Sequence, residues 1–506
     1  MNTLMVDFSF KAVDWDESSF NVVSFTGEEA MSSLYHFDIV LTTDDYDIDV
    51  TSLLHSEASF SFKVGSQQPQ IFHGILAEVS LLGDSSGQLN LAVKLVPKLW
   101  ALNLGQGSQL FLEQSIPDVI VSVLDDRDSN GLVLSYQINM SQEYDKRDFI
   151  CKYNESSFDF ISRLMEKEGI FYYFEQTSDK EILHISDTKM IHQEKADTNA
   201  LRYTRDYGDE ASIAPELISQ FVTKLVRQPK DILFKGYLYS RPDLPPEGKA
   251  PVSENGIGQV YSYGDSYLCQ AHADKIATIR AEQINCDANL CTGESFVSWL
   301  QPGYLFNLKG YVIKSFDKQY LVTSISHEGH NQTLYSNSDK LPYVNTFSCI
   351  SASLPYRDAL KTPLPKVHGT THAVIDSASS SAMLDDEGRY KVKFPFDLSE
   401  TEDGQASYWV RMAQPYGGSG HGMHFPLLKG TEVILTFEGG DPDCPLILST
   451  APNPENPSLV TDSNSNENVI QSASGNKMVM NDSSGGKFIS LESEGCSIQF
   501  GNFNLD

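Results

Sequence analysis

Apolar and polar residues alternate over short stretches in much of this chain, which is the pattern of half-buried β-strands. In the N-terminal part the alternation recurs at positions 6–10, 20–22, 37–41, 60–64 and 89–95, with polar or glycine-containing turns between the stretches. It recurs at 390–394, 408–412 and 433–437, where glycine, proline and aspartate separate the stretches. This spacing predicts small antiparallel barrels or sandwiches.

Three segments carry helical spacing instead, at residues 116–124, 154–169 and 267–286. The expected buried stripes are Phe158, Ile161, Leu164 and Met165 in the second segment, and Ala271, Ile276, Ile279 and Ile284 in the third. Gly169 is a natural end for the second helix, because glycine readily adopts the left-handed conformation found at helix C-termini. The chain is therefore expected to be mainly β with minor α.

The length of the chain indicates the number of domains, and its net charge limits the kinds of partner. The chain has 506 residues, 40% of them hydrophobic, and a formal net charge of -31. This length suits about three domains, and the charge argues against nucleic acid or an anionic membrane as a partner, because both require local positive charge. The same charge makes copies of the chain repel one another. A homo-oligomer must therefore bury enough apolar or hydrogen-bonded surface to overcome that repulsion.

The cysteines argue against a disulfide framework. There are seven, at 151, 269, 286, 291, 349, 444 and 496, with no C-x-x-C spacing. An odd, scattered set also disfavours a structural zinc site. Cys286 and Cys291 are close enough in sequence to form a bridge, but free thiols in a reducing cytosol are the preferred interpretation. No signal-peptide pattern and no run of eighteen apolar residues is present, so a cytoplasmic protein without stable membrane insertion is expected, unless it leaves by a route that needs no cleavable signal.

The C-terminal residues have a period of their own, because glycines recur every ten residues at 475, 485 and 495. Between them lie short alternating apolar pairs, Met478 and Met480, Ile489 and Leu491, and Ile498 and Phe500. Strands this short cannot cover their own apolar face and are expected to stack or intertwine. We expect three chains to wind into a β-prism with these six residues at the trimer contact. A disordered polar tail after Pro457 is the alternative.

Some segments have only part of the pattern of a catalytic or metal site. Asp45, Asp47 and Asp49 have the spacing of a calcium loop, but glycine is absent from the sixth position and Ser56 replaces the bidentate glutamate, so a solvated acidic turn is favoured. His421 and His424 lack a cysteine or carboxylate at ligand spacing. The loop that holds them is neither a nucleophile elbow nor a phosphate-binding loop. No catalytic residue, cofactor or metal is assigned.

The turn at 439–445 admits two interpretations. Its Asp441 and Asp443 could bind a cation between the flanking prolines, or cap the turn through bonds from side chain to backbone. Capping is the more usual role of such residues.

Two stretches carry a resemblance to a known family. Residues 385–445 contain D-x-x-G-R-Y-K-V-K-F, W-V-R-x-A-Q, a glycine-rich loop ending in Phe-Pro, G-T-E-V-x-L-x-F and G-D-P-D-x-P. In this order the motifs resemble the barrel of VgrG proteins, the spike proteins of type VI secretion systems and relatives of the phage tail spike. Residues 152–175, KYNESSFDFISRLMEKEGIFYYFE, are similar to the signature of VgrG hub domains. Lys152 stands where glutamine is common, a change that we interpret as one at the surface.

The barrel motif marks a set of structural positions and also departs from the family pattern. The positions are Gly388, Arg389, Trp409, Arg411, Gly422, Pro426, Gly430, Glu432, Gly440, Asp441 and Pro442. Cys444 stands where the family often has arginine, and 394–397 replace a His-Trp-Asp segment. The first of these departures removes a possible charge pair.

The resemblance implies an architecture. It comprises a tail-hub-like domain with two β-barrels and helical insertions at 1–355, a linker at 356–362, an OB-like antiparallel barrel at 363–452, a loop at 453–467 and a short β-prism needle at 468–506.

The resemblance also implies a mechanical function and no enzymatic one. The expected protein is a homotrimer that caps a tube of hexameric rings, contacts the baseplate, carries a PAAR-type tip protein and transports an effector or adaptor. It is expected to stay in the cytoplasm until the apparatus fires and delivers it into a target cell. The alternatives are a hub of a phage-like tail or extracellular injection particle, a spike-linked cell-wall hydrolase and, more distantly, a carbohydrate-binding β-protein.

Overall fold

The computed structural model describes residues 5–85, 87–126, 133–195, 200–204, 217–265, 267–331, 341–401 and 403–501. The chain divides into two compact units, each described by itself below. The first comprises residues 1–107, 115–147 and 154–364, and the second comprises 108–114, 148–153 and 365–506.

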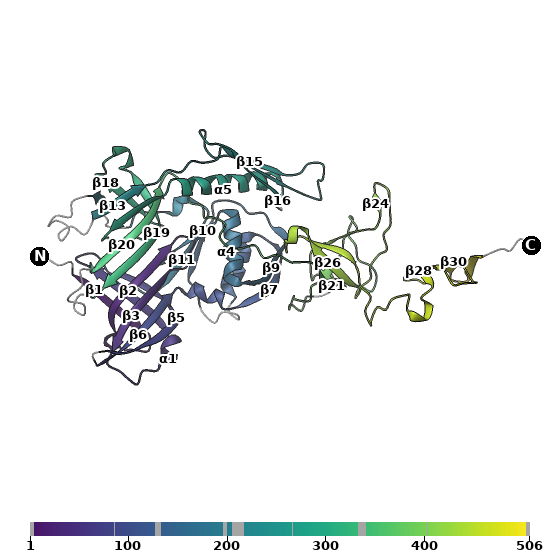
Figure 1. The fold of residues 1–506 in the computed structure, drawn as a ribbon, viewed down its shortest axis with the longest axis horizontal. Helices are drawn as coiled ribbons and strands as arrows, with labels where there is room; N and C mark the ends of the chain where they lie inside the picture. Colours follow the sequence, from purple (N-terminus) through teal and green to yellow (C-terminus); the bar gives the residue numbers. More distant parts are fainter. Residues whose placement is uncertain are drawn as a thin grey trace, which may run out of the picture. The chain divides into compact units, whose positions relative to one another are not determined.

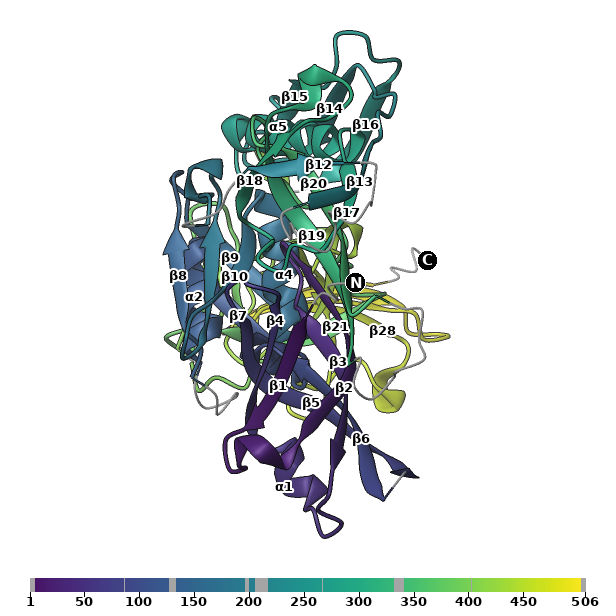
Figure 2. The ribbon, with the colours of Figure 1, turned by 90° about the vertical axis from the view of Figure 1, so that its left-hand side faces the viewer.

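The first unit is built on one twelve-stranded sheet among the described residues, in the order β1-β4-β5-β6-β3-β2-β19-β18-β12-β13-β17-β20. The strands that form the first barrel are β1 (Val6–Ala12), β2 (Asn21–Ala30), β3 (His36–Thr43), β4 (Glu57–Val64), β5 (Gln70–Ser85) and β6 (Gln88–Val96). The strands that form the second barrel are β12 (Leu201–Tyr203), β13 (Leu217–Thr223), β17 (Cys291–Ser295), β18 (Leu305–Lys309), β19 (Gln319–His330) and β20 (Tyr343–Ser351). Figure 2 shows the first set gathered apart from the second. An additional pairing of β19 with β20 closes the second barrel, and the β2–β19 ladder joins the two. The predicted mainly-β fold with two hub barrels is confirmed.

Three glycines in these ladders lie beneath phenylalanine rings. Gly27 is directly opposite Phe37, Gly293 is opposite Phe347, and Gly329 is opposite Phe25. In each pair a Cβ on the glycine would lie within 2.4 Å of the ring. The ring covers backbone that a glycine would otherwise leave exposed, an arrangement that stabilises glycine in strands.

The core of the first barrel is aromatic and surrounds one buried polar group. Phe37, Phe62 and Phe72 pack around the ring of His327, which enters from β19. The imidazole Nδ1 is 2.8 Å from the Tyr343 hydroxyl, and Nε2 is 2.9 Å from Glu29 Oε1. Both ring nitrogens therefore have partners, as burial requires.

Among the described residues, three longer helices and two smaller sheets complete the first unit. The helices are α2 (Ile116–Asp125), α4 (Ser157–Glu168) and α5 (Gln270–Ala288), with a short α1 (Val50–Leu54). The strands of these sheets are β8 (Tyr136–Asn139), β10 (Phe171–Gln176), β11 (Glu181–Ser186), β14 (Asp231–Gly236), β15 (Glu247–Pro251) and β16 (Gln259–Asp265). A further sheet pairs β7 (Gln106–Gln114) with β9 (Arg147–Ser156), and most residues of these two strands belong to the second unit. Short 3-10 turns lie at Glu17–Ser19, Lys98–Asn103, Lys189–Ile191 and Lys314–Phe316. Helix α5 packs against β14 and β15 (Figure 1).

All three predicted helices are present, but their buried faces differ from those expected. In α4, which ends at Gly169 with φ 72°, Phe158 is only partly buried and Phe160 is fully buried. Arg163 in the same helix is buried in a two-pronged ion pair with Glu155, at 2.8 and 2.9 Å, so burial extends beyond one apolar stripe. In α5, Ala271 is exposed, Ile276 is buried and Ile284 is half-buried. The predicted buried stripe of α5 was wrong at Ala271, because β14 and β15 cover a neighbouring face of the helix.

Lys152 is 8% exposed, so its interpretation as a surface position was wrong. The residue lies in β9, whose neighbours Cys151 and Glu155 are buried as well.

Residues 356–362 pack against the rest of the first unit, to which they belong. The Arg357 guanidinium donates to the carbonyl oxygens of Gly169, at 2.6 Å, and Asp187, at 2.8 Å. The Glu166 carboxylate accepts bonds from the backbone of Lys361 and Thr362. Arginine is suited to this position, because its fixed fork of donors can satisfy several carbonyl oxygens at once.

The second unit contains a five-stranded barrel and a separate four-stranded sheet. The barrel strands are β21 (Thr371–Asp376), β22 (Lys391–Lys393), β23 (Arg411–Met412), β26 (Glu432–Phe437) and β27 (Pro445–Thr450), in the order β22-β21-β26-β27-β23. A bridge between Tyr390 and Val410 connects the two ends of this order and closes the ring. Leu110, Phe149 and Tyr153, from the two inserted segments, pack against its core. A hairpin of β24 (Gly417–Gly418) and β25 (His421–Gly422) and 3-10 turns at Glu438–Gly440 and Asp462–Asn464 are also present.

Candidate functional site

The C-terminal sheet is a four-stranded antiparallel meander. Its strands are β28 (Glu467–Gln471), β29 (Lys477–Asn481), β30 (Phe488–Ser493) and β31 (Cys496–Gly501). Gly475, Gly485 and Gly495 lie in the three connecting turns with φ of 85°, 90° and 75°. Residues other than glycine rarely adopt this left-handed conformation, so the ten-residue period sets the positions of the turns.

All six apolar residues of the tail that were predicted to make contact lie on one face of this sheet. Met478 is opposite Leu491, which is opposite Ile498. Met480 is opposite Ile489, which is opposite Phe500. Ile470, opposite Met478, extends the face onto β28 and was missed, because β28 has no second apolar residue on that side. We call these seven residues the apolar tail face.

The apolar tail face is open to solvent in the single chain. Ile489 is 42% exposed, Leu491 46%, Ile498 52% and Phe500 59%. The other side of the sheet carries Val479 and Ser490, each 3% exposed. A contiguous exposed apolar patch on a small sheet is typical of an interaction surface.

The D-x-x-G-R-Y-K-V-K-F motif begins with a turn that is held by the carboxylate of Asp385. Asp385 Oδ1 accepts bonds from the backbone N–H groups of Glu387 and Arg389, and Oδ2 accepts from Arg389 Nε at 2.5 Å. Gly388 lies in the turn with φ 73°. The pKa of Asp385 is lowered, because these bonds outweigh the effect of partial burial. The turn places Tyr390 in the barrel core.

The W-V-R-x-A-Q motif carries two side chains that contact other segments of the barrel. The Trp409 ring lies 5.2 Å from the Lys391 ammonium, a cation–π contact. The Arg411 guanidinium pairs with Glu438. Arg411 thus has a charge partner even though Cys444 replaces the arginine common in the family.

The glycine-rich loop is fixed by a histidine, and no metal cluster forms there among the described residues. His424 Nε2 is 2.7 Å from the Tyr390 hydroxyl, and its Nδ1 is 2.9 Å from Gln414 Nε2. His421 is exposed at the tip of the hairpin, in the strand that also contains Gly422. Pro426 is exposed beyond it.

The G-T-E-V-x-L-x-F motif anchors the end of the barrel sheet. The Gly430 N–H donates to the Ile375 carbonyl at 3.0 Å. Glu432 accepts bonds from Asn453 at 2.7 Å and His372 at 2.8 Å. The Asn453 bond and the His372 contact hold the pKa of Glu432 below its ordinary value.

The G-D-P-D-x-P turn caps itself, as the capping interpretation predicted. Asp441 Oδ1 accepts the Asp443 N–H at 3.0 Å across Pro442, and the Gly440 carbonyl accepts the Val367 N–H at 2.9 Å. Asp443 also accepts the Cys151 N–H at 2.7 Å.

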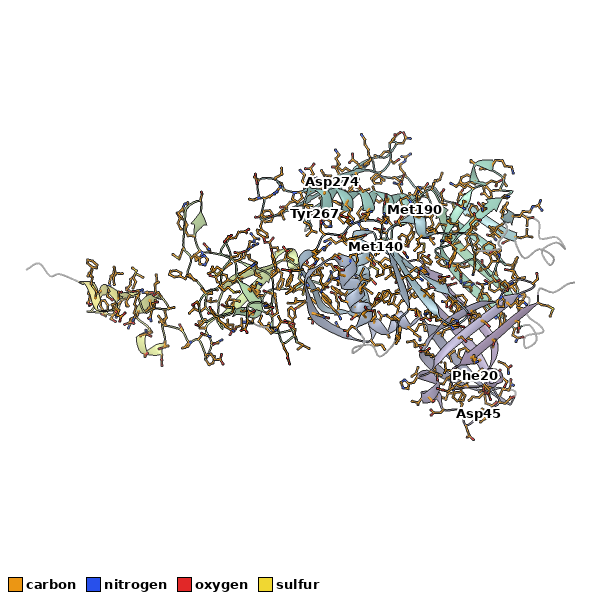
Figure 3. The ribbon with its side chains drawn as sticks, turned by 180° about the vertical axis from the view of Figure 1, so that it is seen from behind. Phe20, Asp45, Met140, Met190, Tyr267 and Asp274 are labelled. Atoms are coloured by element: carbon orange, nitrogen blue, oxygen red, sulfur yellow. The ribbon has the colours of Figure 1, made fainter. Side chains whose placement is uncertain are left out.

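The acidic turn at 45–49 is a capping structure. Asp49 accepts the N–H groups of Thr51 and Ser52 at the start of α1, and Asp45 accepts that of Asp47. Figure 3 shows Asp45 at the periphery of the first barrel. Within the described ranges, no group of three or more His, Cys, Asp or Glu side chains is gathered closely enough to hold a metal ion. The helices in the same ranges are too short or too polar to cross a bilayer.

Comparison with known proteins identifies the family of both units. Residues 28–333 match the sequence model of the phage tail baseplate hub (GPD). Residues 380–451 match the type VI secretion system/phage-baseplate injector OB domain. The predicted OB-like nature of the barrel in the second unit is therefore confirmed.

Curated relatives of the chain carry the names of spike proteins. The chain is 28% identical over 446 residues to the type VI secretion system spike protein VgrG1b of Pseudomonas aeruginosa, covering 85% of this chain and 58% of that protein. It is 26% identical over 457 residues to the actin cross-linking toxin VgrG1 of Vibrio cholerae, covering 87% of this chain and 41% of that protein. The chain thus spans little more than half the length of VgrG1b and less than half that of the toxin.

Solved structures share the fold. The E. coli c3393 protein, described as a component of the type VI secretion system similar to the T4 tail proteins gp27 and gp5, matches with a TM-score of 0.63 and 22% identity, over 87% of this chain and 99% of that one. A chain of the Francisella PdpA–VgrG complex in its half-lidded form matches with a TM-score of 0.66 and 10% identity, over 100% of this chain and 88% of that one. The hub sequence model covers more than half of the chain, and this coverage establishes the family. The chain belongs to the phage tail baseplate hub family and, within it, to the VgrG spike proteins.

Proposed function

We propose that this chain is the hub and spike of a contractile injection apparatus of the type VI kind, and that it works as a homotrimer joined through the apolar tail face. The observation that carries the proposal is the placement of Met478, Leu491 and Ile498, and likewise Met480, Ile489 and Phe500, in two rows on one exposed side of the C-terminal sheet. A sheet whose apolar side faces water is stabilised when copies cover that side.

The charge of the chain means that a trimer needs a favourable contact between its copies. Each copy carries a formal charge of -31, so association has to overcome repulsion between acidic chains. Burying apolar surface contributes about 25 cal/mol per Å². Seven clustered apolar residues per chain are a suitable source of that energy.

The mechanism that we propose is mechanical. A rigid trimer would transmit the thrust of the apparatus to a narrow needle without breaking a bond, so no described residue is given a catalytic role. We propose as partners the hexameric tube protein, the baseplate, a PAAR-type tip protein, and an effector or adaptor. The names of the relatives support this setting, and one similar structure is titled as a PdpA–VgrG complex. The protein would remain in the cytoplasm until firing and would then be delivered into the target cell.

A hub in a phage-like tail or extracellular injection particle is the second candidate. It is favoured by the hub sequence model, which is described as a phage tail baseplate component. In that case the protein would be recovered in free particles outside the cell, and its loss would leave contact-dependent delivery into neighbouring cells unchanged.

A complementation experiment tests the first proposal. In the source bacterium, deletion of the gene should abolish release of the tube protein into the medium, and the wild-type gene should restore it. Leu491→Asp should fail to restore release, because it places a charge on the apolar tail face. Gln499→Asp adds the same charge on the opposite side of the sheet and should restore it. Release that is independent of the gene, or equal restoration by both variants, would contradict the proposal.

A further inference from the structure

Two cysteines that lie 58 positions apart in the sequence are direct neighbours in the second hub barrel. Cys291 on β17 is paired with Cys349 on β20 in the antiparallel ladder. We propose that Cys291 and Cys349 form an oxidation site, a dithiol that closes to a cross-strand disulfide on exposure to a peroxide. The inference is independent of the spike function.

The backbone arrangement suits such a bond. Both side chains belong to the core cluster of the second barrel, so they point to the same side of the sheet. Directly opposed residues in antiparallel strands have Cα atoms about 4.5–5.5 Å apart, within the range of about 4.4–6.8 Å that disulfides use. The Cys291 thiol has the Asn289 carbonyl as a weak acceptor at 4.0 Å, and the Cys349 thiol lies close enough to affect the pKa of Cys291.

The other pairing considered from the sequence is disfavoured. The Cys286 thiol donates to the Pro355 carbonyl at 3.0 Å, and Cys286 packs in a different core cluster from Cys291 and Cys349. All seven cysteines are free thiols in the structure, as the sequence interpretation preferred. The cross-strand register supplies the better partner for Cys291.

The two thiols differ in the way that a two-step oxidation requires. The neighbouring Cys349 thiol and the charge of Lys318 lower the pKa of Cys291 against the effect of burial. Burial and the neighbouring Cys291 raise the pKa of Cys349. Cys291 is therefore the first thiolate and Cys349 the thiol that resolves the intermediate. Cys291 is 6% exposed and Cys349 is fully buried, so a small oxidant is required.

Hydrogen peroxide meets this requirement, and the chemistry balances. The Cys291 thiolate attacks one peroxide oxygen, the S–O bond forms, the O–O bond breaks, and hydroxide leaves with the proton of Cys349 as water. The Cys349 thiolate then attacks the Cys291 sulfur, forming the S–S bond and expelling hydroxide. This hydroxide takes up the proton that Cys291 had released. Two thiols are oxidised to one disulfide, and one peroxide is reduced to two waters.

The bond would fasten the barrel close to its point of closure. Strand β20 pairs with β17 on one side and with β19 on the other, and the β19–β20 ladder closes the ring. Figure 1 shows β19 and β20 side by side in the first unit. In a reducing cytosol the dithiol would stay open, and an oxidising environment would convert it to the covalent form.

Peptide mapping of the purified full-length protein tests the proposal. The reduced protein is titrated with hydrogen peroxide, remaining thiols are blocked with iodoacetamide, and the protein is digested without reductant for mass spectrometry. A cross-linked pair of peptides containing Cys291 and Cys349 is expected, together with a rise in the midpoint of thermal unfolding. Dithiothreitol should reverse both changes.

Two variants separate the chemistry of the pair from general oxidation. Cys286→Ser removes another buried thiol and should leave the cross-link unchanged. Cys349→Ser should abolish the cross-link and leave Cys291 as a sulfenic acid that dimedone traps. The wild-type mapping does not depend on either variant being well folded. Recovery of Cys291 and Cys349 only as separate alkylated peptides, at peroxide concentrations that oxidise the exposed Cys496, would overturn the proposal.

Discussion

The carboxylate of Asp443 accepts a hydrogen bond from the backbone N–H of Cys151 at 2.7 Å, although 292 positions separate the two residues in sequence. Asp443 belongs to the G-D-P-D-x-P turn, and Cys151 belongs to the segment 148–153 that the barrel unit includes. Phe149 and Tyr153, on either side of Cys151, pack against the barrel core. The motif turn thus fastens a distant segment to the barrel.

Replacing Asp443 with alanine should lower the free energy of unfolding of the barrel unit by about 1–3 kcal/mol, because a part-buried N–H loses a charged acceptor. Urea unfolding followed by tryptophan fluorescence measures the change. Glu455→Ala, at an exposed position in the same unit, is the matched control and should stay within about 0.5 kcal/mol of wild type. Equal effects of the two substitutions would show that the Cys151 bond is not the cause.

Among the carboxylates of the hub, removal of Glu168 should lower the free energy of unfolding the most. It is 3% exposed and contacts Arg147, His272 Nε2 at 3.0 Å and Lys275 Nζ at 3.1 Å. Burial alone would raise its pKa, but the His272 bond and the charges of Arg147 and Lys275 hold the pKa well below the ordinary value. Glu168→Gln should cost about 3 kcal/mol at pH 7, since it leaves buried cations without their counter-charge.

The pH dependence of that cost tests its electrostatic origin. A carboxyl whose pKa is lowered on folding stabilises the protein above its unfolded pKa and loses this contribution as the pH falls. The difference between wild type and Glu168→Gln in urea unfolding should therefore be full at pH 7 and shrink below about pH 4.5. An unchanged difference at pH 3 would indicate a packing defect instead.

Glu181 should behave in the opposite way. Burial raises its pKa to about 7, its Oε1 accepts the Lys98 N–H at 2.8 Å, and its Oε2 has no partner among the described residues. A raised pKa means that stability is full below the unfolded pKa and is lost as the pH rises through 7. Glu181→Gln should match wild type at pH 4 and exceed it by about 1–3 kcal/mol at pH 8. Glu247→Gln, at a half-exposed ion pair with Lys235, should show little difference at either pH.

The glycines beneath phenylalanine rings should tolerate no side chain. A Cβ on Gly293 would lie 2.3 Å from the Phe347 ring, whereas one on Gly107 would meet no atom within 4 Å. Gly293→Ala should lower the free energy of unfolding by about 1–3 kcal/mol through overpacking. Gly107→Ala should change it by about 0.5 kcal/mol or less. Similar losses for both would remove the steric explanation.

The sequence predicted those features that depend on local periodicity. Alternate positions of a strand share a face, so Met478 and Met480 could be assigned to one side before any pairing was known. The glycine at the end of α4 and the glycines of the tail turns could be predicted for the same local reason.

Features that depend on distant partners could not be predicted. The burial of Lys152, the contact between Cys291 and Cys349, and the bond from Cys151 to Asp443 all follow from long-range pairing. The alternation at 390–394 and 408–412 indicated strands where β22 and β23 lie, but it could not show which strands they pair with. Ala271 was misplaced because the strands that cover α5, β14 and β15, lie 20 to 40 positions earlier in the chain.

The most direct test of the account is the mass of the full-length protein in solution by multi-angle light scattering, measured for wild type, Leu491→Asp and Gln499→Asp. The account predicts a wild-type mass near three times the chain mass of 56.3 kDa. It also predicts a smaller mass for Leu491→Asp and a trimer for Gln499→Asp. A wild-type protein with the mass of one chain, or a Leu491→Asp variant that stays trimeric, would contradict the assignment of the apolar tail face as the contact between copies.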